Sequence, residues 1–298
     1  MQILESPAAM RSWSDEQHAR GLRIGLVPTM GALHAGHLAL IGVARERCDV
    51  VAVSIFVNPL QFNRTDDFEH YPRSVDDDLE QCRAAGVGAV YAPTQQSMYP
   101  PGFETHVEPG ALAEPLEGAG RPGHFRGVVT VVCKLFNAVG PDVAVFGQKD
   151  FQQLAVIRRM VADLDMGVEI CGVSTVREHD DLALSSRNRR LSPDQRAAAV
   201  VVVRALDVIE VAISAGSRDA VELQRLAADV VATEAAARLE YVDVVDPHTL
   251  LAPTDTNALL LAVIAVWFGD VRLIDNRLID ARALTDDRAN ATVFDDFA

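Results

Sequence analysis

The sequence predicts an α/β protein in which a larger domain with a parallel sheet precedes a smaller α+β domain. Over the first 190 residues or so, short runs rich in Val and Ile alternate with segments of helical apolar spacing. That alternation is typical of a parallel sheet with crossover helices. After about Asn188, two Ala-rich helical stretches precede three strand-like runs. We expect domains over 1–187 and 188–284, and a disordered acidic tail over 285–298.

In the larger domain, the expected elements follow one another as strand, helix and strand. Apolar β-branched runs predict the strands, and apolar residues three and four apart predict the helices between them. We expect strands over 23–29, 49–57, 86–93, 141–147 and 168–175, and helices over 37–47, 76–86 and 149–165. Ligands of parallel sheets bind at the carboxyl ends of the strands, so we expect the functional site at that edge.

The smaller domain has a different pattern. Helical spacing is expected from Ser192 to Ser214 and from Arg218 to Arg238. Three apolar runs then predict strands over 239–246, 258–267 and 271–276.

Composition limits the possible partners. Hydrophobic content of 49% and charged content of 23% are those of an ordinary globular protein. A net charge of -15 argues against nucleic acid or an anionic membrane as a partner, although a small anionic ligand senses only the local field. The cysteines show no C-x-x-C pair, the N-terminus lacks a signal-peptide pattern, and the apolar runs are too short to cross a bilayer. These features predict a cytoplasmic protein.

The most informative segment is "VPTMGALHAGHLALI", residues 27–41. It leaves a strand, turns at Gly31 and starts a helix near Gly36, where backbone N–H groups suit a phosphate. His34 and His37 are three apart and can lie on one side of this helix start. An isolated His would more often be a capping or core residue, and no cluster of Cys, Asp or Glu completes a zinc site. The H-x-G-H pattern is typical of Rossmann-like nucleotidyltransferases, and it leaves the acceptor open.

Further segments narrow this choice. "FVNPLQF" ends the next strand and places Asn58 and Gln61 at the same sheet edge. "EGAGRPGHFRGVVTVVCKLF", "VFGQKDFQQLAVIRRM" and "REHDDLALSSRN" follow in order. With these motifs, the chain resembles the pantothenate synthetase family, the pantoate–β-alanine ligases, over nearly its whole length.

The resemblance implies an activity and a set of site residues. ATP and pantoate would form a pantoyl adenylate, from which the amine of β-alanine displaces AMP, with Mg2+ present and a homodimer as the assembly. Pantoate would be held by Gln61 and Gln153, Gln61 would also contact the β-alanine site, and Asn58 would be a further substrate-binding residue. The catalytic residues would be His37, His34, Lys149 and Arg187. No residue is assigned as a metal ligand. The implied ATP-binding residues are Met30, Gly31, Ala32, Leu33, His34, Ala35, Gly36, His37, Gly147, Gln148, Lys149, Asp150, Val176, Leu184, Ser185, Ser186 and Arg187.

The chemistry of these residue types fits the implied roles. Attack of a carboxylate on a phosphate builds charge on phosphate oxygens, which cations and N–H donors stabilise. Lysine occupies only two of the 27 basic positions, Lys134 and Lys149, and a compact ammonium can follow phosphate oxygens better than a planar guanidinium. Primary amides can both donate to and accept from the hydroxyl and carboxylate groups of pantoate.

The sequence leaves the roles of several residues undecided. Ser185 and Ser186 could cap a turn, and the cluster 76–78 could be a helix-start charge cluster or lie near Mg2+ or β-alanine. Glu117 and Arg121 could line the cavity or form a surface pair. The chain departs from the family pattern at Asp181, usually glycine, and in the loop 63–68, which lacks the usual Gly and Pro.

Two other functions compete with the ligase. One is a nucleotidyltransferase with another acceptor, such as a cytidylyltransferase, which would release pyrophosphate from CTP. The other is a non-catalytic adenine-nucleotide sensor, which would bind nucleotide without turnover.

Overall fold

The computed structural model describes residues 1–63, 68–69 and 71–282. Contacts between residues divide the chain into two compact units. Unit one comprises Met1–Gln148 and Gln152–Thr175, and unit two comprises Lys149–Phe151 and the chain from Val176 onward. The predicted domain boundary after residue 187 stays a prediction, and the predicted tail 285–298 lies outside the described residues.

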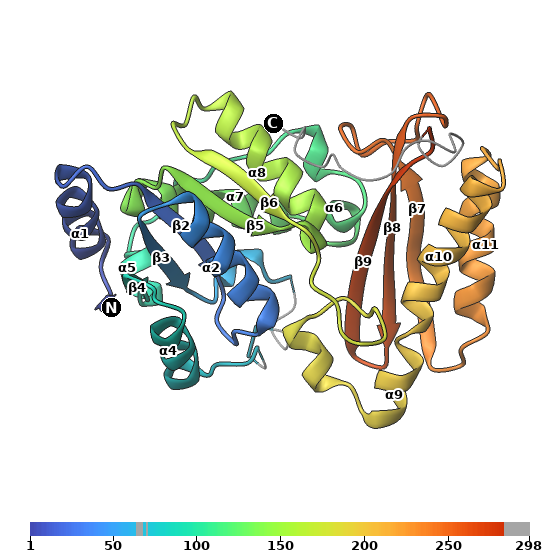
Figure 1. Cartoon of the computed structure of the whole chain (residues 1–298), viewed down its shortest axis with the longest axis horizontal. Helices are drawn as coiled ribbons and strands as arrows, with labels where there is room; N and C mark the ends of the chain where they lie inside the picture. The colour runs from blue at the N-terminus through green and yellow to red at the C-terminus, as the bar shows by residue number, and fades with distance from the viewer. Residues whose placement is uncertain (64–67, 70, 283–298) are drawn as a thin grey trace. The chain divides into compact units, whose positions relative to one another are not determined.

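Unit one is built on a six-stranded sheet, and every strand pair in it is parallel (Figure 1). The strand order is β1-β4-β3-β2-β5-β6. This confirms the predicted parallel α/β fold. The strands are β1 (Gln2–Leu4), β2 (Ile24–Thr29), β3 (Val50–Ile55), β4 (Ala89–Tyr91), β5 (Val143–Gly147) and β6 (Glu169–Val173).

Helices pack on both faces of this sheet. Buried side chains of α2 and α4 pack with one set of strand residues, and those of α1, α7 and α8 pack with the other set. The main helices are α1 (Pro7–Ala19), α2 (Ala35–Arg47), α4 (Val75–Ala84), α7 (His124–Val139) and α8 (Phe151–Asp163). The short ones are α5 (Gln95–Met98), α6 (Glu117–Gly120) and the 3-10 turns η1 (Pro59–Gln61), η2 (Ala111–Ala113) and η3 (Gln148–Asp150).

The direction in which successive strands are added to the sheet reverses between the neighbouring strands β2 and β5. The connection from β2 to β3 runs toward one edge, and the connection from β5 to β6 runs toward the other. A parallel sheet opens a crevice at such a switch point, beyond the carboxyl ends of the two strands. The segments that follow β2 and β5 therefore occupy the position where a ligand is expected, and these are the segments beginning at Met30 and Gln148.

Unit two contains a three-stranded antiparallel sheet in the order β7-β8-β9 and the helices that cover it. This confirms the predicted α+β pattern. Its elements are η4 (Ser186–Arg190), α9 (Pro193–Ala198), α10 (Val201–Ser214), α11 (Ala220–Ala232), β7 (Ala237–Val245), β8 (Leu259–Phe268) and β9 (Val271–Asp280).

Two predicted helix extents in unit two are wrong. The first expected helix is divided, because Val202 N–H bonds to the carbonyl of Ala199 in a tighter i→i+3 turn between α9 and α10. The second ends at Ala232 rather than continuing to Arg238. Pairing with β8 overrides the helix propensity of the Ala-rich segment, and Arg238 already lies in β7.

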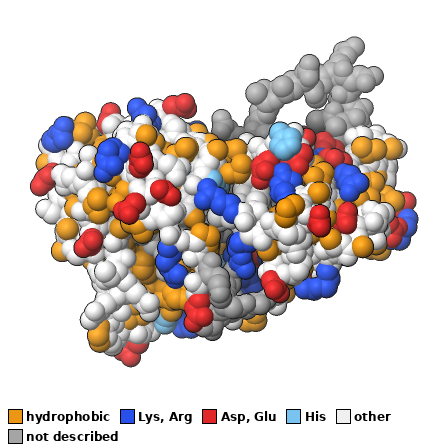
Figure 2. Space-filling model, turned by 90° about the horizontal axis from the view of Figure 1, so that it is seen from below, with side chains coloured by type: hydrophobic (Ala, Val, Ile, Leu, Met, Phe, Trp, Pro, Cys, Tyr) orange, Lys and Arg blue, Asp and Glu red, His pale blue; other side chains and the backbone are white. Residues whose placement is uncertain are grey.

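Charge is mixed at the surface. On the face shown in Figure 2, Lys and Arg side chains stand among acidic and apolar ones, although the net charge is -15. A small anion can therefore meet local positive charge. Within the described ranges, no helix is both long and apolar enough to span a membrane.

Candidate active site

The backbone N–H groups of the turn after β2 form hydrogen bonds to side chains, and these bonds fix the turn. The N–H of Gly31 donates to Thr29 Oγ1 at 3.1 Å, and that of His34 donates to His37 Nδ1 at 3.3 Å. Between them, the N–H groups of Ala32 and Leu33 donate to the carboxylate of Asp78. The N–H groups expected to suit a phosphate lie further on, at the helix start near Gly36, where the N–H of Gly36 donates to Nδ1 of His34 at 3.2 Å. The ligand-binding groups of this turn are therefore sought in its side chains.

His34 and His37 form a reciprocal cap at the start of α2. Nδ1 of His34 accepts from the N–H of Gly36 at 3.2 Å, and Nδ1 of His37 accepts from the N–H of His34. The ring centroids are 4.1 Å apart. A nitrogen that accepts carries no proton, so each neutral ring carries its proton on Nε2. The cap thus turns both rings into Nε2–H donors, which is the chemistry that phosphate oxygens require.

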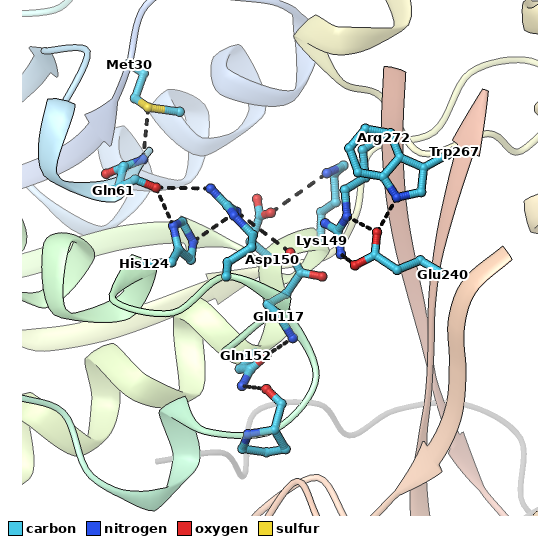
Figure 3. Close-up of polar contacts among 12 residues, drawn as sticks. Met30, Gln61, Glu117, His124, Lys149, Asp150, Gln152, Glu240, Trp267 and Arg272 are labelled. Atoms are coloured by element: carbon cyan, nitrogen blue, oxygen red, sulfur yellow. Dashed lines mark hydrogen bonds and ion pairs between the residues drawn. The ribbon is translucent and has the colours of Figure 1, made fainter. Parts of the chain in front are cut away.

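Asn58 holds the side chain of Gln61. Its Nδ2 donates to Oε1 of Gln61 and to the carbonyl of Gly127, both at 3.0 Å, while its Oδ1 accepts from Leu60 N–H and from Tyr99. All four hydrogen-bonding positions of this amide are used, and Asn58 is 1% exposed. Since Oε1 of Gln61 is engaged, its Nε2 is the donor group, and it lies 3.0 Å from Sδ of Met30 (Figure 3).

The backbone carbonyl of Gln61 is held from the other side by α6 and α7. Nδ1 of His124 lies 2.7 Å from this oxygen, and Arg121 donates to it at 3.1 Å (Figure 3). Arg121 also lies 3.8 Å from the carboxylate of Glu117, which is buried. These three residues, from the motif "EGAGRPGH", therefore support Gln61 rather than forming an isolated surface pair.

Two adjacent glutamines on α8 have different environments. Gln152 is buried, and its amide accepts from Glu117 N–H and donates to the carbonyls of Leu112 and Pro115. Gln153 is half-buried, and within the described part of the chain no hydrogen bond is formed by its side chain. Gln152 therefore fastens the loop before α6, which leaves Gln153 as the glutamine suited to a ligand.

In unit two, the segment from Val176 to Leu184 folds back on itself. The N–H of Leu184 donates to the carbonyl of Val176 at 2.9 Å, and Arg177 pairs with Ala183. Asp181 lies in this reversal with φ of 63°. This is the left-handed region that glycine adopts most easily and Asp tolerates, so the departure from glycine is accommodated.

The turn that follows carries Ser185, Ser186 and Arg187. Ser185 caps η4 by accepting from the N–H of Arg187 at 3.2 Å, and Ser186 is buried. The capping that the sequence left open is present at Ser185. The structure brings these residues together with Val176 and Leu184 in one unit.

Arg196 fastens this segment from α9. It donates to both oxygens of Asp180 and to Glu178, while Asn188 donates to Glu178 at 2.6 Å. Hydrogen bonds from Arg196 lower the pKa of Asp180. Burial alone would raise the pKa of Glu178, but hydrogen bonds from Arg196 and Asn188 outweigh burial and lower it.

Lys149 lies two residues after β5, and its side chain is 17% exposed. Its carbonyl accepts from Asn276 at 2.8 Å, and its Nζ lies 3.8 Å from Asp150 (Figure 3). The backbone at Lys149 is thus fixed to β9, while the ion pair between its ammonium and the neighbour in sequence is long. Such a cation can exchange this contact for another anion.

A sequence model described as pantoate–beta-alanine ligase matches residues 2–278. The chain belongs to the pantoate–β-alanine ligase family. It is 51% identical over 281 residues to the pantothenate synthetase of Heliobacterium modesticaldum, covering 94% of this chain and 100% of that one. It is 50% identical over 277 residues to pantothenate synthetase 1 of Bradyrhizobium diazoefficiens, covering 93% and 97%.

Solved structures agree with this membership of the ligase family. The pantothenate synthetase of Thermus thermophilus superimposes with a TM-score of 0.87 at 44% identity, covering 93% of this chain and 99% of that one. The pantoate–β-alanine ligase of Francisella tularensis, complexed with beta-gamma ATP and β-alanine, gives a TM-score of 0.78 at 33% identity, covering 93% and 97%.

The family motifs name the candidate site residues, but they do not identify the residues that support them. No sequence pattern distinguishes Tyr99 or Arg196, and His124 appears only within the longer motif "EGAGRPGHFRGVVTVVCKLF". In the sequence, Asp78 is one of three consecutive aspartates. A supporting residue acts through hydrogen bonds to residues distant in the sequence, and no local spacing signals such a contact.

Proposed function

We propose that this chain condenses pantoate with β-alanine at the expense of ATP, through a pantoyl-adenylate intermediate. The observation that carries the proposal is the His34–His37 pair, which presents two Nε2–H donors directly after β2 at the switch point of the sheet. Membership of the ligase family supports the choice of acceptor. The Francisella tularensis relative, solved with an ATP species and β-alanine, supports these two substrates.

In the first step, a carboxylate oxygen of pantoate attacks the α-phosphorus of ATP, and pyrophosphate leaves. Negative charge grows on phosphate oxygens during this transfer, so preorganised donors lower the barrier. We assign His34 and His37 to these oxygens as Nε2–H donors. Lys149 contributes an ammonium that follows the α-phosphate into the transition state, and Arg187 adds a further cation.

Pantoate is assigned to Gln61 and Gln153. The donor orientation of Gln61, set by Asn58, suits an acceptor oxygen of the substrate. In the second step, the amine of β-alanine attacks the acyl carbon of the adenylate, the acyl–oxygen bond breaks, and AMP leaves. The amine loses a proton as the amide forms.

Mg2+ is proposed as the partner of the ATP phosphates. Among the described residues, no group of three or more His, Cys, Asp or Glu side chains is placed to hold a metal. Mg2+ usually keeps several waters and binds through substrate phosphates and one or two carboxylates. In the proposed reaction, Mg2+ would arrive with ATP and neutralise phosphate charge.

The assembly and the compartment are also proposals. Family resemblance suggests a homodimer, which light scattering would test as a mass twice the 32.2 kDa of the chain. A cytoplasmic location is supported by the need for ATP and by Cys48, Cys82 and Cys133, which are thiols.

The test is the pantoate-dependent exchange of labelled pyrophosphate into nucleotide, without β-alanine. We expect exchange into ATP and none into CTP. Exchange into CTP would favour a cytidylyltransferase-like enzyme. Binding of ATP without any exchange would favour a nucleotide sensor.

A further inference from the structure

Asp78 is the third of three consecutive aspartates in the first turn of α4, but only this one is buried. Asp76 and Asp77 are exposed, whereas Asp78 is 1% exposed. Successive residues of a helix point about 100° apart, so one of three neighbours can face the interior while the others face solvent. Stabilisation of the helix start needs no burial, and the position of Asp78 therefore needs another explanation.

The Asp78 carboxylate accepts two short hydrogen bonds from consecutive backbone groups of the turn after β2. Oδ2 accepts from Ala32 N–H at 2.8 Å, and Oδ1 accepts from Leu33 N–H at 2.7 Å. Ser74 Oγ donates to Oδ1 at 3.3 Å. Hydrogen bonds from N–H groups to an ionised carboxylate are among the stronger hydrogen bonds in proteins, so Asp78 stabilises the conformation of this turn.

The backbone conformation of the turn is unfavourable by itself and needs stabilising hydrogen bonds. Gly31 and Ala32 have φ of 82° and 50°, in the left-handed region that alanine rarely adopts. The Asp78 oxygen packs so closely that a Cβ on Gly31 would lie 2.9 Å from it. His34, whose ring caps α2, follows two residues after Ala32.

We propose that Asp78 is a positioning residue that fixes the turn Gly31–Leu33 and thereby aims the His34 and His37 rings at the phosphates of ATP. The proposal rests on the proposed function for the assignment of these rings to ATP. Asp78 does not touch the substrate in this account. Its hydrogen bonds give the carboxylate a structural role at this position, where its negative charge alone would oppose a polyphosphate.

The negative charge of Asp78 allows two explanations to be distinguished by the direction in which ATP affinity changes. If Asp78 acted only through its charge, removing that charge would strengthen ATP binding. If Asp78 positions the turn, Asp78→Asn weakens it, because an amide offers one acceptor oxygen and would place its NH2 group against an N–H donor. Asp77→Asn and Glu80→Gln remove the same charge from the same helix outside this contact and serve as matched controls.

The experiment measures the ATP dissociation constant by calorimetry and the rate of pyrophosphate exchange for all four proteins. We expect Asp78→Asn to weaken ATP roughly tenfold and to slow exchange by about two decades, the scale of misplaced reacting groups. KM for pantoate should change less than KM for ATP. The controls should stay within about twofold of the parent. An Asp78→Asn protein that folds and binds ATP as the controls do would overturn the proposal.

A measurement on the parent protein covers the case in which Asp78→Asn does not fold. Amide hydrogen exchange should show protected N–H groups at Ala32 and Leu33 without any ligand, and rapid exchange there would also overturn the proposal. The proposed function fails separately, if the parent shows no pantoate-dependent pyrophosphate exchange. Hydrogen exchange at the two amides would still decide whether Asp78 holds the turn.

Discussion

The hydroxyl group of Tyr99 donates a hydrogen bond of 2.8 Å to Oδ1 of Asn58. This bond completes the four hydrogen bonds of Asn58, the amide that sets the donor orientation of Gln61. Burial raises the pKa of Tyr99, so the hydroxyl stays protonated and able to donate throughout any neutral-pH assay. Tyr99 thus influences Gln61 through one intermediate side chain.

Tyr99→Phe should raise KM for pantoate about fivefold, because a buried amide oxygen loses a partner at a cost of about 1 kcal/mol and Asn58 becomes less firmly held. KM for ATP should not change. Tyr91→Phe is the matched control, since within the described residues the buried Tyr91 hydroxyl has no hydrogen-bond partner. Steady-state kinetics of both variants would check this, and equal pantoate KM values for the two would contradict it.

Substitution can separate the roles of the two ring nitrogens of His37. His37→Asn keeps an acceptor near the position of Nδ1 and should preserve the cap and the melting temperature. It removes the Nε2–H donor, so pyrophosphate exchange should slow by about two decades, the usual cost of losing one transition-state donor. His37→Gln, which reaches the Nε2 position, should retain more activity. If His37→Asn exchanges pyrophosphate at the parent rate, the assignment of Nε2 as a donor is wrong.

Substitution of Gln153 should affect pantoate binding, whereas substitution of Gln152 should affect stability. Gln153→Ala should raise KM for pantoate about tenfold while leaving KM for ATP and the melting temperature unchanged, because a substrate group loses its partner. Gln152→Ala should instead lower the free energy of unfolding by about 2 kcal/mol, since three backbone groups lose their bonds. Kinetics together with urea unfolding would separate the two, and a pantoate effect confined to Gln152→Ala would reverse the assignment.

Stability should depend on pH through Arg196. The pKa values of Glu178 and Asp180 are lowered in the folded state, so their stabilising effect is complete above the unfolded values, about 4.3 and 3.9, and is lost as pH falls through the folded values. Arg196→Leu should therefore lower the melting temperature clearly at pH 7 and progressively less as the pH falls below about 4.

The matched control for this prediction is Arg225→Leu, which removes an exposed pair with Asp229 on a helix surface. An exposed pair contributes little to stability, so this variant should melt like the parent over the same pH range. A destabilisation by Arg196→Leu that stays constant as the pH falls below about 4 would show that packing, not charge, explains the effect.

The sequence predicts β2 to β6 and three of the five main helices of unit one, because apolar periodicity and strand length are local properties, whereas β1, α1 and α7 were not predicted. The expected strand over 23–29 and the helix ending at Arg47 agree with β2 and α2 within two residues. The break after Ala198 left no signal, since the run "AAAVVVV" is uniformly apolar. The end of α11 was missed because pairing of Arg238 with Trp267 is a tertiary contact.

For the candidate site, the motifs identify residue types but not their hydrogen bonds. Asp76, Asp77 and Asp78 are three identical letters, and only the rotation of α4 distinguishes the buried one. Gln152 and Gln153 are likewise adjacent and chemically identical. Which of them faces the protein depends on the loop at Leu112 and Pro115, about forty residues away in the chain.

The central claim is that the pantoate carboxylate attacks the α-phosphorus of ATP, and isotope transfer tests it most directly. Pantoate labelled with 18O in its carboxylate is turned over with ATP and β-alanine, and the products are analysed by mass spectrometry. The adenylate route predicts that each AMP formed carries one 18O atom and that pyrophosphate carries none. Label in inorganic phosphate or pyrophosphate, with unlabelled AMP or ADP as the nucleotide product, would contradict the account.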